Sequence, residues 1–307
     1  MEKRHQANGL LLLVAAIWGT TFVAVKVAIA DIPPFTFNAV RFSIAFLSML
    51  LLLPLFRQDL TGKAVWYSLL AGMCSFGGYS LQTIGLQYTT AANSAFITGL
   101  SVVLVPVITA VIHKKRPARQ VISGVLCAAA GLGLLSFGAG APAAWAGAPA
   151  RLMFNTGDLF TLGCALCFAL NIILVARYTN QINTFLFAAG QIGTVALFSI
   201  LAGWGAEGLP ITFTPGVVAA LLVTAIPATT LAFLFQTWAQ KYTSPATTAV
   251  ILSLEPVFAL LFALIVLAEI PTGLQLLGAA LMLASMFIVD QGSAADKAPT
   301  GTKKVGA

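Results

Sequence analysis

The sequence predicts an all-α membrane protein with ten transmembrane helices, arranged as two inverted repeats of five helices. Three observations lead to this fold class. The 307 residues are 59% hydrophobic and only 8% charged, with a mean hydropathy of +0.95; in ordinary soluble proteins about a quarter of the residues are charged. Ten apolar runs are long enough to cross a bilayer, and the second half of the chain repeats the first.

The apolar runs are each roughly 18–23 residues long, the length that a helix needs to cross about 30 Å of hydrocarbon. Helices are expected because barrel strands would show about ten residues of alternating polarity instead. In chain order, the predicted spans cover residues 9–30, 35–56, 64–85, 91–112, 119–137, 158–177, 184–204, 215–238, 245–267 and 272–290.

The repeat is visible in LQTIGLQYTT at residues 81–90, which returns as FQTWAQKYTS at residues 235–244. The same shift of 154 positions aligns Pro117 with Pro271. Each copy holds five spans, an odd number, so the second copy enters the membrane from the opposite side. The predicted units are a first five-helix repeat (1–137), an external linker (138–157), a second inverted repeat (158–290) and a disordered cytoplasmic tail (291–307).

The positive charges predict the orientation. With a cytoplasmic N-terminus, thirteen of the sixteen Lys and Arg residues fall on the inside, as the positive-inside rule requires. These thirteen are Lys3, Arg4, Arg57, Lys63, Lys114, Lys115, Arg116, Arg119, Arg177, Lys241, Lys297, Lys303 and Lys304. We therefore expect both termini in the cytoplasm, and the net charge of +7 reflects topology and not a nucleic-acid partner.

Inverted repeats are typical of transporters, whose substrate site lies near the middle of the membrane between the repeats. An inert scaffold or a receptor is the alternative to a transporter. The sequence contains no P-loop and no cluster of metal ligands, so it predicts no cofactor, no metal and no catalytic residues. Transport would draw on an ion gradient, on exchange or on the gradient of the substrate itself.

Several segments resemble the EamA-type proteins of the drug/metabolite transporter superfamily. They are WGTTFVAVK (18–26), NAVRF (38–42), YTTAANSAFI, YTSPATTAVI and the long segment from SLEPVF to LMLAS (253–285). The resemblance implies ten helices and a carrier of the bacterial inner membrane. Such carriers typically export amino acids, related metabolites or drug-like compounds.

Three charged residues lie inside predicted spans away from the terminal residues, where charges are costly and usually functional. Lys26 and Arg41 would form a cationic patch for a substrate carboxylate, although snorkelling to the headgroups or pairing with Asp31 explains them equally well. Glu255 lies about ten residues into the ninth span, before Pro256. A carboxyl in such surroundings can take up and release a proton. Glu255 is thus the candidate for proton coupling and substrate binding, and a neutral or paired glutamate that fixes helix packing is the equally good alternative.

Uncharged polar residues in the spans complete the predicted substrate site. Gln82 and Gln236 are partners in the repeat and would face each other near the pseudo-twofold axis. Asn38 and Asn93 are further candidates, although hydrogen bonds between helices are an equally good explanation for such residues. Trp18 and Tyr79 would provide flat apolar walls, where packing is the simpler alternative.

The sequence therefore predicts a secondary transporter that exports amino acids or related small metabolites by alternating access through a central cavity. The alternatives are an exporter of drug-like organic cations and, less favoured, an intramembrane enzyme or a structural subunit. Its expected partners are a small-molecule substrate, the lipid bilayer and a coupled proton, and a homodimer is compatible with such a carrier.

Overall fold

The computed structural model describes residues 2–52, 61–138, 155–267 and 270–295, and within them it is almost entirely helical, with no strand. The predicted all-helical fold is confirmed. The helical segments are α1 (Glu2–Gly19), α2 (Thr21–Ala28), α3 (Pro34–Leu52), α4 (Gly62–Tyr88), α5 (Ala91–Gly99), α6 (Ser101–His113), α7 (Arg119–Gly138), α8 (Thr156–Tyr178), α9 (Thr184–Glu207), α10 (Pro215–Ala225), η2 (Ile226–Leu231), α11 (Ala232–Ala239), α12 (Pro245–Leu252), α13 (Glu255–Leu267) and α14 (Gly273–Ala295).

These segments form the ten predicted spans. Of the described helical segments, nine are long and apolar enough to cross a membrane. The tenth span is α4, which has 27 residues but is more polar, because it carries Ser68, Ser75, Ser80, Gln82 and Gln87. Four spans are broken: the first into α1 and α2, the fourth into α5 and α6, the eighth around η2 and the ninth into α12 and α13.

The predicted boundaries between the repeats fall mainly outside the described residues. Of the predicted linker, residues 139–154 lie outside them, while α8 begins at Thr156 with a capping box formed by Asn155 and Asp158. The last helix continues to Ala295, five residues into the segment predicted as a disordered tail, and residues 296–307 lie outside the description.

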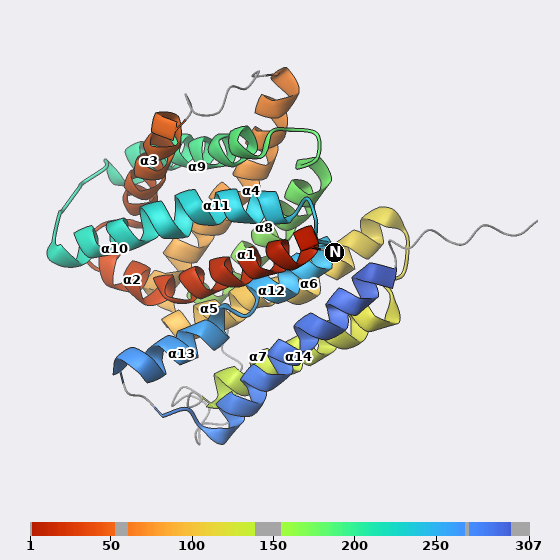
Figure 1. Ribbon diagram of the computed structural model, residues 1–307. Helices are drawn as coiled ribbons and strands as arrows, with labels where there is room; N and C mark the ends of the chain where they lie inside the picture. Colours follow the sequence, from red (N-terminus) through yellow and green to blue (C-terminus); the bar gives the residue numbers. More distant parts are fainter. Residues whose placement is uncertain (1, 53–60, 139–154, 268–269, 296–307) are drawn as a thin grey trace, which may run out of the picture.

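The helices pack with the symmetry that two inverted repeats require. The equivalent helices α3 and α9 contact each other, as do α7 and α14, and the contact of α6 with α12 is matched by that of α5 with α13. The contact of α4 with α8 is matched by contacts of α11 with α1 and of α10 with α2. In Figure 1 the pair α7 and α14 runs along one edge of the bundle.

The repeated YTT and YTS motifs each start a helix at equivalent positions. The Thr90 hydroxyl accepts a hydrogen bond from the backbone N–H of Asn93 at 3.1 Å, which caps α5. The Ser244 hydroxyl accepts one from Thr247 at 3.0 Å, which caps α12. Such caps satisfy N–H groups that have no partner within their helix. The repeat in sequence is therefore a repeat of helix starts.

Two glycines allow α7 and α14 to approach closely. A Cβ atom on Gly131 would lie 2.7 Å from the carbonyl oxygen of Gly278, and one on Gly278 would lie 2.6 Å from the carbonyl oxygen of Gly131. Without a hydrophobic driving force between helices in lipid, such close backbone packing is a main source of association. A side chain at either position would push the two helices apart.

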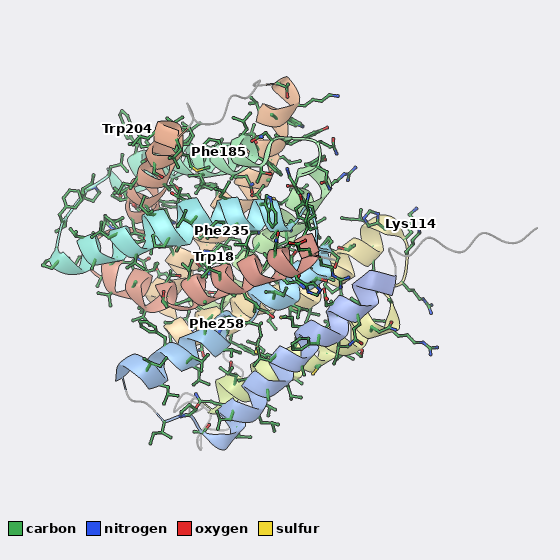
Figure 2. The ribbon with its side chains drawn as sticks, viewed as in Figure 1. Trp18, Lys114, Phe185, Trp204, Phe235 and Phe258 are labelled. Carbon is green, nitrogen blue, oxygen red and sulfur yellow. The ribbon has the colours of Figure 1, made fainter. Side chains whose placement is uncertain are left out.

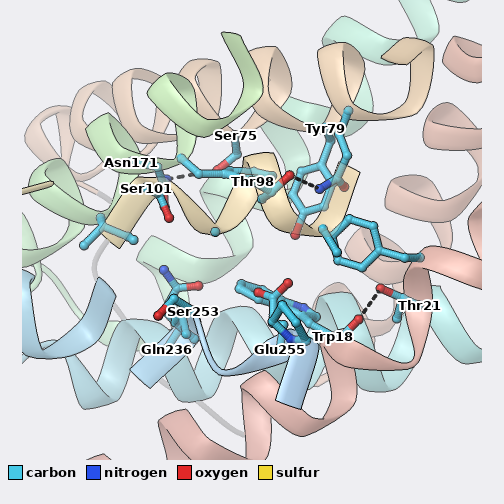
Figure 3. Close-up of a pocket in the computed structure, with 18 of the residues that line it drawn as sticks. Trp18, Thr21, Ser75, Tyr79, Thr98, Ser101, Asn171, Gln236, Ser253 and Glu255 are labelled. Atoms are coloured by element: carbon cyan, nitrogen blue, oxygen red, sulfur yellow. Dashed lines mark hydrogen bonds between the residues drawn. The ribbon is translucent and has the colours of Figure 1, made fainter. Parts of the chain in front are cut away.

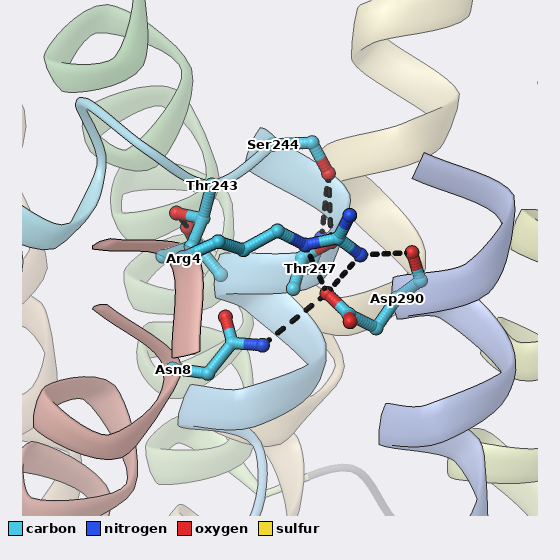
Figure 4. A network of polar contacts seen from close by, with 7 residues as sticks. Arg4, Asn8, Thr243, Ser244, Thr247 and Asp290 are labelled. Atoms are coloured by element: carbon cyan, nitrogen blue, oxygen red, sulfur yellow. Dashed lines mark hydrogen bonds and ion pairs between the residues drawn. The ribbon is translucent and has the colours of Figure 1, made fainter. Parts of the chain in front are cut away.

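The end of the bundle where α1 begins carries most of the described positive charge, and we call it the basic end. An ion pair there links the first and last helices, because the Arg4 guanidinium lies 2.5 Å from an Asp290 carboxylate oxygen. The same oxygen accepts a hydrogen bond from Asn8 at 3.2 Å, as Figure 4 shows. Partly exposed pairs of this kind contribute only about 0–1 kcal/mol, so the contact fixes geometry more than stability.

Candidate functional site

A central cavity lies between the two halves of the molecule. Residues of α1, α2, α3, α4, α5, α6, α8, α11, α12 and α13 line it. It contains about 750 Å³ of atom-free space, but only about 60 Å³ of this is open to the centre of a water-sized sphere. One water requires about 10–15 Å³ on that measure. In this conformation, the cavity therefore accommodates only a few waters.

Three of the four helix breaks face this cavity. Trp18 and Thr21 flank the break between α1 and α2, Ser101 begins α6, and Ser253 and Glu255 flank the break between α12 and α13. Helix ends leave backbone N–H and C=O groups without partners in their own helix. Broken membrane helices place such ends next to a polar substrate. The breaks thus make an otherwise apolar region suitable for a charged or polar molecule.

Glu255 is the first residue of α13, and its side chain lines the cavity. The helix is interrupted before Glu255, at residues 253 and 254, so Pro256 is the second helical residue. Proline is well tolerated there, because the N–H group that it lacks would have no partner. Pro256 thus follows the break and does not weaken a continuous helix.

The Glu255 carboxyl has no hydrogen-bond or ion-pair partner in the described part of the chain. Figure 3 shows Glu255 and Tyr79 on facing sides of the cavity. The positive end of the α13 dipole lies at Glu255 and favours a negative charge there. The carboxyl is therefore available to a ligand or to a proton.

Arg41 of α3 provides a positive charge to the same cavity. It is only 3% exposed, and its Nε donates a hydrogen bond of 2.9 Å to the Thr229 hydroxyl. Its guanidinium carbon lies 4.9 Å from the centre of the Tyr79 ring, a cation–π distance. No carboxylate pairs with Arg41 among the described residues. The cavity thus contains one cation and one acid that do not neutralise each other.

The π-helix η2 orients two of the predicted site residues. Thr229 in η2 accepts the hydrogen bond from Arg41, and the carbonyl oxygen of Ala228 accepts one from the Trp18 indole at 2.7 Å. A π-helix leaves local backbone groups without their α-helical partners and is frequent at functional sites. Here its irregular turn fixes the side chains of α1 and α3 against the cavity.

Six of the nine predicted site residues come together at the cavity, namely Trp18, Arg41, Tyr79, Gln82, Gln236 and Glu255. The Gln82 amide donates to the Thr98 hydroxyl at 3.3 Å, and the Gln236 amide donates to Gln240 at 3.4 Å. Both bonds are long, so both amides remain available to a ligand. Their role in binding stays a prediction.

The other three predicted site residues lie outside the cavity lining. The Lys26 ammonium group donates hydrogen bonds to the backbone carbonyl oxygens of Leu86 and Thr89 at the end of α4. The bond to Thr89 is 3.0 Å long. A lysine there complements the negative end of the helix dipole. The buried Asn38 donates to Tyr79 and Thr83, and the backbone of Asn93 completes the cap of α5. These contacts give all three a structural explanation.

Several small polar residues line the cavity besides the nine predicted site residues. The Asn171 amide donates to the Ser75 hydroxyl at 2.9 Å, and Thr98 and Ser101 lie near the break between α5 and α6. Ser101 could have been found from the sequence, because it is the repeat counterpart of Glu255. Serine and threonine are too frequent in membrane helices to mark a site without such a signal.

The comparisons with known proteins decide the family. The model of the EamA-like transporter family matches residues 6–137 and again residues 155–289, one match in each half of the chain. The chain belongs to the EamA-like transporter family. It is therefore a multi-pass membrane transporter, and the resemblance inferred from its motifs is confirmed.

Relatives of this EamA-like transporter cover almost its whole length. An uncharacterized transporter of Archaeoglobus fulgidus is 40% identical over 288 residues, which cover 94% of this chain and 86% of the relative. The uncharacterized transporter YoaV of Bacillus subtilis is 24% identical, and the match covers 91% of this chain and 94% of the relative. A solved structure described as "Crystal structure of protein" matches with a TM-score of 0.74 at 19% identity, covering 95% of this chain and 99% of that one. That likeness concerns the fold alone.

Close packing at Gly19 positions Glu255 in this EamA-like transporter, and it gives a first testable prediction. A Cβ atom on Gly19 would lie 2.5 Å from the carbonyl oxygen of Glu255. Overpacking of this kind costs about 1–3 kcal/mol, so we expect Gly19→Ala to lower the midpoint of thermal unfolding by about 2–8 °C. Gly9→Ala in the same helix is the matched control, because no atom lies within 4 Å of that position. Equal unfolding midpoints for Gly19→Ala and Gly9→Ala would contradict the close contact between Gly19 and the start of α13.

Proposed function

We propose that this EamA-like transporter exports amino acids or related zwitterionic metabolites by alternating access through the central cavity. The observation that carries the proposal is the pair of opposite, unneutralised charges in one lining, Arg41 and Glu255. An amino acid presents a carboxylate and an ammonium group. The planar guanidinium of Arg41 suits the carboxylate, because it can donate to both oxygens. Glu255 suits the ammonium group.

The dimensions of the cavity imply that transport needs a change of shape. A space for a few waters is too small for an amino acid, so the halves must move apart to admit one. Two inverted halves can exchange conformations and open first to one side and then to the other. The helix breaks beside Trp18, Ser101 and Glu255 are the places where such a movement can bend the spans.

We further propose that Glu255 couples transport to protons. A carboxyl without a partner among the described residues can be neutral in one stage of the cycle and charged in another. Binding of the substrate ammonium group favours the charged form and thereby releases a proton. No chemical change of the substrate is part of this cycle, so we propose a carrier and not an enzyme.

The basic end is proposed to face the cytoplasm of a bacterial inner membrane. Lys63, Lys114, Lys115, Arg116 and Arg119 lie there, whereas Asp31, Asp158 and Glu207 lie at the opposite end. Positive residues accumulate on the cytoplasmic side of membrane proteins.

Organic cations are the second candidate substrates. Tyr79 packs edge-to-face on Phe168 with ring centres 5.0 Å apart, and Phe233 adds a third ring to the lining. An aromatic wall beside one acid can bind a flat cation through stacking and cation–π contacts. On this alternative Glu255 binds the substrate, and Arg41 serves only the packing of α3 against η2.

Efflux from proteoliposomes tests the proposed function. Vesicles with the purified protein would be loaded with a pool of labelled amino acids, or with a labelled aromatic cation, and release would be followed with and without a pH gradient. We expect release of amino acids that the pH gradient accelerates. Release of the cation alone would favour the second candidate, and release of neither would contradict both.

A further inference from the structure

A second cavity opens at the basic end of the bundle, separate from the central one. It lies between the end of α6, the following loop, the start of α7 and the start of α12. It is the roomier of the two, because about 270 Å³ is open to the centre of a water-sized sphere, compared with about 60 Å³ in the central cavity. The two cavities share no lining residue.

We call this second cavity the basic pocket, because the ionisable side chains among its described lining residues are all basic. His113, Lys115 and Arg116 lie at its exposed rim, and none of the described residues that line it is acidic. Pro106 and Val121 contribute to an apolar floor. The pocket therefore combines a cationic rim with an apolar interior, at the level where a membrane span ends.

One further feature favours an anionic ligand. The pocket includes Ser244 and Pro245 at the start of α12, where the helix dipole places a positive partial charge. This partial charge adds to that of the cationic side chains at the rim.

The positive-inside rule explains why positive charges lie at this end of the bundle, but it does not explain why two of them line a cavity. Lys114 belongs to the same His113–Arg116 run but does not line the pocket, and Figure 2 shows it at the turn after α6. Arg119 at the start of α7 is also exposed and also outside the lining. If topology were the whole reason, these four cations would be equivalent. The structure instead divides them into two that line the pocket and two that do not.

We propose that the basic pocket binds a phosphate group, carried by an anionic phospholipid whose acyl chains lie along the apolar floor. Basic pockets between membrane helices at the cytoplasmic side are suited to such headgroups. Free inorganic phosphate has the same charged oxygens but lacks the acyl chains. The two sources can therefore be distinguished. The inference does not depend on which substrate the central cavity transports.

Thermal unfolding of the purified full-length protein in detergent tests the proposal. Phosphatidylglycerol, phosphatidylcholine or inorganic phosphate would be titrated in, since a ligand that binds only the folded state raises the unfolding midpoint. The test variant is Lys115→Gln/Arg116→Gln. The matched control is Lys114→Gln/Arg119→Gln, which removes the same two charges from outside the pocket.

We expect phosphatidylglycerol to stabilise the wild type and the control, and phosphatidylcholine to have little effect. Each Lys or Arg near a membrane surface increases the affinity for an anionic lipid about fivefold. The test variant lacks two such residues, so it should bind phosphatidylglycerol about 30-fold more weakly. Stabilisation by inorganic phosphate that is lost in the same variant would assign the pocket to a free phosphate ligand. Equal losses in the two double variants, or equal effects of the two lipids, would overturn the proposal.

Discussion

Glu255→Gln is expected to reduce the export of a zwitterionic substrate by about 10- to 100-fold and to remove its acceleration by a pH gradient. The amide has almost the shape of the carboxyl but can neither carry the charge nor exchange the proton. A hydrogen bond to a charged group is worth about 1.5–3 kcal/mol, which corresponds to that range of affinities. Initial efflux rates from proteoliposomes at several internal substrate concentrations would measure the effect.

Glu2→Gln is the matched control for this result, because Glu2 is an exposed glutamate at the start of α1, far from the cavity lining. It should transport at the wild-type rate and keep the response to the pH gradient. If Glu255→Gln kept that response while losing rate, Glu255 would bind the substrate but not couple the proton. An unchanged rate would remove Glu255 from the site altogether.

Arg41→Gln is expected to weaken the binding of a zwitterionic substrate by at least 30-fold. Loss of one partner of a buried charge pair costs about 2–5 kcal/mol. Arg41→Lys should recover only part of the loss, because lysine keeps the charge but not the planar fork that donates to both carboxylate oxygens. The measurement is the half-saturation concentration of efflux, taken together with the unfolding midpoint of each variant.

The unfolding midpoint separates binding from folding. Arg41 also bonds to Thr229 and stacks on Tyr79, so some loss of stability is expected in both variants. Arg177→Gln, at an exposed position of α8, serves as the control for loss of a positive charge. If Arg41→Gln transported an amino acid with unchanged half-saturation, the guanidinium would be a packing element, and the organic-cation alternative would gain.

The ten spans could be predicted from the sequence because each is an apolar run long enough to cross the membrane. The helix breaks could not be predicted from it, because hydropathy does not register one or two residues that leave the helical path. At the break in the fourth span Leu100 is itself apolar, and at the break in the ninth span Ser253 lies between Leu252 and Leu254. At the break in the first span, Gly19 packs closely against the start of α13. That packing depends on the tertiary fold.

The candidate site was only partly predictable for a similar reason. Charge inside a span singled out Arg41 and Glu255, which line the cavity, but it singled out Lys26 as well, which does not. The cost of burying Lys26 is offset by carbonyl oxygens at the end of α4, at Leu86 and Thr89, which are 60 positions or more away in sequence. Whether a buried charge meets such a partner cannot be read from its own span.

The most direct test of a zwitterion site compares one transported amino acid with two derivatives that each lack one charge. The carboxamide lacks the carboxylate that we assign to Arg41, and the N-acetyl derivative lacks the ammonium group that we assign to Glu255. Competition for efflux by each compound would be measured with the wild type, Arg41→Gln and Glu255→Gln. We predict that the wild type rejects both derivatives, that Arg41→Gln no longer distinguishes the amino acid from its carboxamide, and that Glu255→Gln no longer distinguishes it from the N-acetyl form. Equal discrimination by all three proteins would contradict the assignment of the two charges to substrate recognition.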